Sequence, residues 1–222
     1  MNTMFKGLAQ FISWLFHPLL MLTYMFALLM ITNPYSFGVG VNQVGEGRSG
    51  LLLIYVFLET SLIPAILISM MKKLELMPSL NLGDRTSRIL PFIATGMLYM
   101  WLYANFSRLP DVPIAFESAI LGTIIALFTA FMLNIFSKIS LHTVGMGSLV
   151  GMVMVTILLF NYSSFQFGNT MYSMYGVLFI AIALAGLVGS ARIIVENPTP
   201  KDLYSGYIVG FASQLIALQF VI

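Results

Sequence analysis

Seven long apolar segments, with few charges between them, constrain this chain more than any other feature. They lie at about residues 11–31, 50–71, 90–107, 113–137, 143–161, 172–190 and 203–222. Each is close to the ~20 residues that a helix needs to cross a bilayer. Only 8% of the 222 residues are charged, while 59% are hydrophobic. A soluble domain of that composition could not cover its core with polar groups. No series of short alternating segments suggests a membrane β-barrel. We therefore expect an all-α, polytopic transmembrane helical bundle.

The lengths and composition also limit the domain organisation and the partners. Seven spans use ~140 residues, so 1–222 is expected to be a single transmembrane domain. The first segment is longer than a signal-peptide core and is followed by Asn33-Pro34 instead of a small-residue cleavage site, so we interpret it as a retained span. Without cysteine, disulfides and thiolate metal sites are excluded, and no cofactor or metal is expected. A net charge of +2 argues against a nucleic-acid partner.

Basic residues follow the parity of the spans. With seven spans, the N-terminus and the second, fourth and sixth loops share one face of the membrane. That face carries eight basic residues and the opposite face two, and the pattern predicts that the first face is cytoplasmic. The first set is Lys6, Lys72, Lys73, Arg85, Arg88, Lys138, Arg192 and Lys201, and the second is Arg48 and Arg108. Basic residues that are present to bind an anionic ligand would produce the same excess on one face, whichever side of the membrane that face is on.

Three polar stretches gather on the face that holds the N-terminus: residues 81–91, 138–145 and 190–202. Together they contain arginines, Lys138, His142, hydroxyl groups and Asp202. Arginine forks bind phosphate oxygens bidentately, and the N–H groups at a helix start favour an anion. Basic residues at helix ends are also ordinary membrane anchors. For a single loop the anchor interpretation is preferable, whereas three loops on one face make a phosphate site an even alternative.

The spacing within these stretches follows a known three-motif pattern. Ser140-Leu141-His142 keeps the serine and histidine of a Pro-Ser-Gly-His motif. Arg192 and Asp202 keep the ten-residue spacing of a motif written Ser-Arg, five residues, His, three residues, Asp. The first motif, Lys, six residues, Arg-Pro, is matched only by Arg85, Arg88 and Pro91. Over about residues 72–210 the chain thus resembles the type 2 phosphatidate phosphatases, a superfamily of membrane lipid phosphatases, with an extra N-terminal span at about 11–31.

The resemblance implies a role for each matching residue. Arg192, Ser140 and His142 would hold a phosphate group and Arg88 or Arg85 would close over it, while His142 would also be the catalytic acid. Lys138, in the second polar stretch, is a further candidate for binding the phosphate. The family's nucleophilic histidine falls on Pro198, which has no nucleophile. Losing a nucleophile removes several orders of magnitude of rate, so the usual hydrolytic mechanism is in doubt.

Two acidic residues have interpretations that do not depend on the three motifs. Thr199-Pro200-Lys201-Asp202 matches an N-cap threonine, a proline at the first helical position and an acid at the third, which predicts that Asp202 closes a capping box. Glu59 lies inside the second segment, where a charge is a functional candidate by default. We favour a structural hydrogen bond near a kink at Pro64. His17, early in the first segment, could join the polar stretches, but we interpret it as an interfacial histidine, which is the more common case.

These observations lead to one hypothesis and two alternatives. The hypothesis is a divergent lipid phosphatase-like protein that hydrolyses or binds the phosphate of a phospholipid or polyprenyl (di)phosphate. The first alternative is a non-catalytic membrane subunit or lipid-phosphate binder, and the second is a small transporter that uses Glu59. Expected partners are membrane lipid and a lipid phosphate, with another membrane protein or a second copy of the chain as further candidates. The expected location is a bacterial inner membrane.

Overall fold

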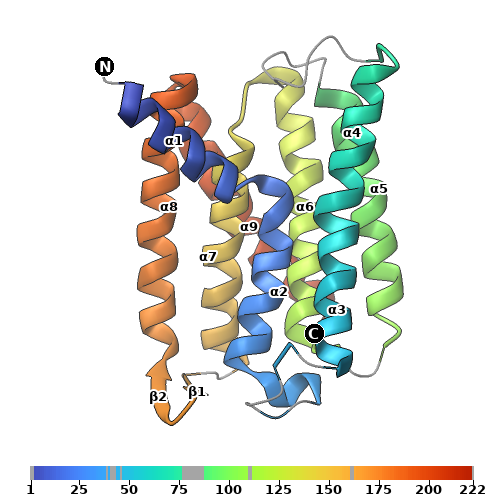
Figure 1. Ribbon diagram of the computed structural model, residues 1–222, viewed down its shortest axis with the longest axis vertical. Helices are drawn as coiled ribbons and strands as arrows, with labels where there is room; N and C mark the ends of the chain where they lie inside the picture. The colour runs from blue at the N-terminus through green and yellow to red at the C-terminus, as the bar shows by residue number, and fades with distance from the viewer. Residues whose placement is uncertain are drawn as a thin grey trace.

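The computed structural model describes residues 3–38, 40, 44–45, 47–76, 88–109, 112–160 and 163–221. Within these ranges it contains seven helices or helix series that are long and apolar enough to cross a membrane. They form one bundle, in which α1 and α9 run obliquely to the other helices (Figure 1). The expected all-α polytopic bundle is therefore confirmed, and the chain is an integral multi-pass membrane protein. The helical elements are α1 (Thr3–Leu15), η1 (Pro18–Leu20), α2 (Met21–Thr32), η2 (Pro34–Phe37), α3 (Gly47–Phe57), η4 (Leu58–Leu62), α4 (Ile63–Lys73), α5 (Ile89–Phe106), α6 (Ile114–Phe136), α7 (Leu141–Leu159), α8 (Met174–Glu196) and α9 (Pro200–Val221).

The first span is not one straight helix. It breaks at His17, whose backbone is extended, and Pro18 then opens the short η1 turn. Proline lacks the N–H that would continue the ladder from α1, so the chain can change direction there. α1 slants across the upper end of the bundle and packs on α8, whereas α2 runs down its centre (Figure 1). The break therefore places residue 17 inside the bundle and not at its periphery.

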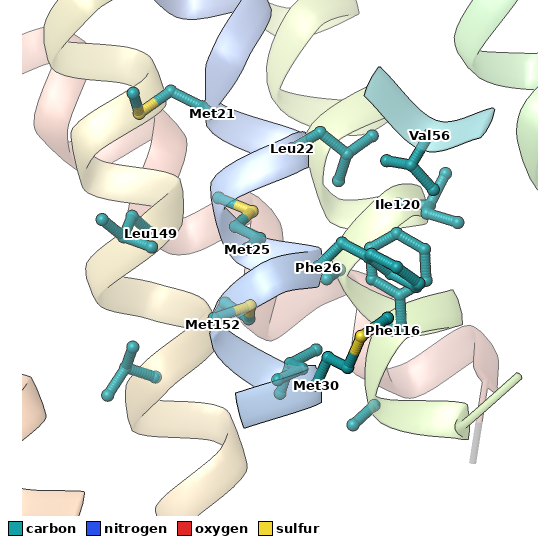
Figure 2. Close-up of a cluster of buried hydrophobic side chains, with 14 of the residues drawn as sticks. Met21, Leu22, Met25, Phe26, Met30, Val56, Phe116, Ile120, Leu149 and Met152 are labelled. Atoms are coloured by element: carbon teal, nitrogen blue, oxygen red, sulfur yellow. The ribbon is translucent and has the colours of Figure 1, made fainter. Parts of the chain in front are cut away.

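The hydrophobic core is built around α2. Met25 and Phe26 are fully buried, and the ring centroid of Phe26 lies 4.5 Å from that of Phe116 on α6. Figure 2 shows the side chains of α2 interleaved with those of α3, α6 and α7. Between helices in lipid, such packing is a principal source of stability, because lipid tails are as apolar as the side chains. The labelled residues are Met21, Leu22, Met25, Phe26, Met30, Val56, Phe116, Ile120, Leu149 and Met152.

α7 and α9 make the closest helix contact of the bundle, and glycines permit it. A Cβ added at Gly147 or Gly151 of α7 would run into the backbone of α9 at Tyr207 or Phe211, and one at Gly210 of α9 would run into Val144. Small residues at such positions let helix backbones approach. The close approach fixes the start of α7 against the start of α9, where two of the polar stretches lie.

The second span contains a turn of π-helix, η4, between α3 and α4. It ends where Ile63 N–H donates to the carbonyl of Leu58, directly before Pro64. A wider turn thus precedes Pro64, the position of the expected kink. One carboxyl oxygen of Glu59, Oε2, is buried in this turn without a hydrogen-bond partner among the described residues. The carboxyl group nevertheless has the expected structural hydrogen bond, which it makes with the side chain of Tyr55.

Two boundaries differ from the sequence-based expectation. The polar turn cluster after the fifth span includes a short antiparallel hairpin, β1 (Ser164–Phe167) and β2 (Thr170–Ser173), at the lower end of Figure 1. The sixth span does not end near residue 190. α8 continues to Glu196 and stops at Asn197, which has left-handed backbone angles. Arg192 therefore lies inside a helix and not in the loop that follows it.

Candidate functional site

A cavity of about 150 Å³ lies inside the bundle, and α2, α5, α6, α7 and α8 contribute to its walls. Its charged and imidazole groups come from the start of α5, the start of α7, the end of α8 and the break before η1. These are the upper helix ends in Figure 1, so the polar groups gather at one end. Farther into the bundle the walls are mostly apolar. The polar end contains His17, Arg88, Ser140, His142, Arg192 and Glu196, and the inner walls include Met21, Met25, Phe92, Tyr99, Ala126 and Leu127.

Arg88 sits at the N-cap position of α5 and is only 5% exposed. Its Nη1 donates to the carbonyl of Ile139 at 3.0 Å and to Oδ1 of Asn134 at 3.3 Å. Burial lowers the pKa of the Arg88 guanidinium, and the charge of Arg192 lowers it too, while Glu196 and Asp202 act in the opposite direction. An arginine stays protonated under such shifts. Arg88 is therefore a fixed, buried cation at the cavity.

Arg192 is the second buried cation, also 5% exposed, in the last full turn of α8. Its Nη2 forms an ion pair with Oε1 of Glu196, one turn later on the same helix. Its Nε is buried and has no hydrogen-bond partner among the described residues. A buried N–H without an acceptor costs free energy. An anion oxygen in the cavity would supply that acceptor.

Ser140 and His142 begin α7. Ser140 occupies the N-cap position, its hydroxyl makes no capping hydrogen bond, and its N–H donates to the carbonyl of Asp202 at 3.1 Å. His142 Nε2 lies 3.1 Å from the carbonyl oxygen of Ser13. A carbonyl only accepts, so Nε2 is the donor. The ring of His17 stands nearly perpendicular to that of His142, with centroids 5.8 Å apart.

Four of the residues named from the sequence thus line one cavity: Arg88, Ser140, His142 and Arg192. Lys138 is not among the lining residues, although its charge acts on Glu196 nearby. Glu59 lies on η4 and does not line the cavity either. Arg85 lies outside the described residues.

Asp202 closes the predicted capping box. Its Oδ2 accepts from the N–H of Thr199 at 3.0 Å, and its own N–H donates to Oγ1 of Thr199 at 3.3 Å. The reciprocal pair satisfies donors at the start of α9. This prediction is confirmed, and the carboxylate is occupied by the helix end. Neither Asp202 nor Pro198 lines the cavity.

Sequence reasoning missed two members of the site. His17 was interpreted as an interfacial residue, although Pro18 directly after it is the signal that could have shown the break in the first span. Glu196 was missed because the sixth span was ended too early, and its spacing of four from Arg192 is the signal that a longer helix would have revealed. Among the described residues, no group of three or more His, Cys, Asp or Glu could hold a metal ion.

The arrangement is a cationic pocket with an apolar interior. Two buried guanidinium groups face one acid among the lining residues, and two imidazoles lie beside them. Such a set can bind an anion through charge-assisted hydrogen bonds. No family model, no curated protein and no solved structure matches this chain.

Proposed function

We propose that the cavity binds the phosphate head group of a membrane lipid. The observation that carries the proposal is the pair of buried arginines at the polar end of an otherwise apolar cavity, one with an unsatisfied Nε. Burying a charged group without full compensation is costly, so such groups mark functional sites inside membranes. A phosphate would supply both the negative charge and the acceptor.

A lipid fits this cavity better than a soluble anion does. The walls beyond the arginines are formed by side chains such as Met25, Phe92 and Leu127. Those surfaces would contact the first carbon atoms of a lipid tail, while the head group meets the arginines at the membrane face. The resemblance of the sequence to the lipid phosphatases supports the same class of ligand. A bundle of this kind suits a bacterial inner membrane, because outer-membrane proteins are mostly barrels.

Binding is preferred over hydrolysis by two features of the third polar stretch. Pro198 stands where the related enzymes have their nucleophile, and Asp202 is engaged in a helix cap. Hydrolysis is kept as a second candidate because His142 and His17 both line the cavity beside Arg192. A transporter that uses Glu59 receives no support from the cavity, since that residue does not line it. A subunit role would use the same pocket and differ only in a membrane protein partner.

The test measures binding of phosphatidate to detergent-solubilised protein. Phosphatidate, but not phosphatidylcholine, is expected to raise the melting temperature. Arg192→Ala should weaken binding about 10- to 100-fold, because a hydrogen bond to a charged group contributes about 1.5–3 kcal/mol. Lys201→Ala is the matched control, since Lys201 is exposed on the same membrane face and does not line the cavity.

Equal binding by wild type and Arg192→Ala would refute the pocket. The second candidate is tested in the same samples by release of inorganic phosphate from phosphatidate and from a polyprenyl diphosphate. Release that His142→Ala abolishes would establish hydrolysis. Binding without release would leave the protein as a lipid-phosphate binder.

A further inference from the structure

The hydrogen bonds of His17 fix which of its ring nitrogens carries the hydrogen. His17 is the N-cap residue of η1, and its Nδ1 accepts from the N–H of Leu19 at 3.3 Å. An accepting nitrogen carries no hydrogen, so the hydrogen of the neutral ring is on Nε2. The ring lines the cavity. His17 therefore brings one N–H donor to the site from the N-terminal segment.

His142 has its Nε2 engaged with the main chain. Nε2 donates to the carbonyl of Ser13 at 3.1 Å, at the end of α1. Nδ1 of the neutral ring is then the nitrogen with a free lone pair. The two rings are neighbours, 5.8 Å apart at their centroids. One histidine thus offers a hydrogen and the other an acceptor.

We propose that His17 is a further residue of the anion site and that the two histidines together recognise an anion carrying both a bare oxygen and a hydroxyl. A singly protonated terminal phosphate has this pattern. Its P–O⁻ oxygens would accept from Arg88, Arg192 and Nε2 of His17, and its P–OH would donate to Nδ1 of His142. The inference rests on the proposed function, because it describes the same cavity.

Capping alone does not account for His17. Asparagine, aspartate and serine are the preferred N-cap residues, and histidine is not among them. An imidazole that only capped η1 would use Nδ1 alone, whereas this half-buried ring also lines the cavity with its other nitrogen. The break at Pro18 also brings this ring to Arg192, whose charge acts on it. The place of the ring at the cavity and its nearness to Arg192 both agree with His17 and Arg192 binding the same anion.

The test uses His17→Asn, which separates the two roles of the side chain. Asparagine can accept from the Leu19 N–H and keep the cap, but it lacks the distant ring donor. Binding of inorganic phosphate and of sulfate to solubilised protein is measured near pH 6 by calorimetry. Phosphate carries a hydroxyl at this pH and sulfate does not. Wild type is expected to prefer phosphate, and His17→Asn should keep the unliganded melting temperature while binding phosphate about fivefold more weakly.

A second variant tests the acceptor. His142→Gln keeps an N–H for the Ser13 carbonyl and removes Nδ1, so it should lose the preference for phosphate over sulfate. Nitrogen-15 spectra of labelled histidine provide a readout that a structural role would not give. Both rings should be protonated at Nε2 in the free protein, and phosphate should shift the signals of His17 Nε2 and His142 Nδ1. This measurement also decides the question if either variant fails to fold.

Each result has one meaning. Phosphate binding by His17→Asn equal to that of wild type, with unshifted ring signals, would overturn the role of His17. Equal affinity of wild type for phosphate and sulfate would overturn the role of His142 Nδ1. Lipid-phosphate binding that depends on Arg192 while the histidine signals stay unchanged would leave the proposed function intact and end this inference. No binding of phosphate or phosphatidate by wild type would end both.

Discussion

Glu196→Gln should strengthen anion binding although it removes an ion pair. Without a ligand, the carboxylate of Glu196 contacts Nη2 of Arg192, so an incoming phosphate must compete with it. Glutamine keeps the size of the side chain and removes the charge. The pocket would then hold two arginines and no acid among its lining residues.

The magnitude follows from charge and exposure. Two unit charges 4 Å apart interact by about 4 kcal/mol at an effective dielectric constant of 20. The Glu196 side chain is 42% exposed, against 7% for Arg192, so water screens the pair strongly. A value near that of exposed pairs, about 1 kcal/mol, is the appropriate estimate. That corresponds to roughly fivefold tighter binding of phosphate.

The assay is calorimetric titration of solubilised protein with a short-chain phosphatidate. Glu196→Gln should show tighter binding together with a lower melting temperature in the absence of lipid, because buried Arg192 loses its partner. Adding salt should narrow the difference between the variant and wild type. Weaker or unchanged binding by the glutamine variant would refute the reasoning that Glu196 competes for Arg192.

Three further predictions concern stability. Asp202→Ala should lower stability by about 1 kcal/mol through loss of the capping box, with phosphate affinity unchanged; a changed affinity would show that Asp202 acts in the site. Gly147→Val should cost more than about 2 kcal/mol by thermal denaturation, because its Cβ meets the backbone of α9, whereas Gly186→Val, which meets nothing within 4 Å, is the control. Glu59→Gln should leave the melting temperature equal or higher, since it removes a charge from a partly buried carboxyl group; a clear drop would indicate a paired carboxylate.

The spans could be predicted from the sequence because hydropathy and length report directly on the bilayer. The capping box at Thr199 and Asp202 could also be predicted from the sequence, since it depends on residues only three positions apart. Both signals are local. The grouping of Arg88, Ser140, His142 and Arg192 was suggested by span parity, which assigns loops to a face but gives no distance between them.

The remaining features depend on contacts that sequence order hides. The pairing of His17 with His142 requires the break before η1. It also requires the hydrogen bond from His142 to the carbonyl of Ser13, 129 residues earlier in the chain. The π turn in the second span has no composition signal that separates it from an ordinary helix. Glu196 could be identified as a site residue only from the exact end of α8. Helix ends are the least certain part of a prediction from one sequence.

The hydrogen bonds of Arg88 have a consequence for the order in which the protein is assembled. Its acceptors, Asn134 and Ile139, follow it by 46 and 51 residues, and Arg192 comes later still. During synthesis Arg88 is therefore made before any of these groups. These hydrogen bonds can form only after the later spans have been added. Closure of the pocket is consequently a late event, because its walls are complete only when α7 and α8 have docked.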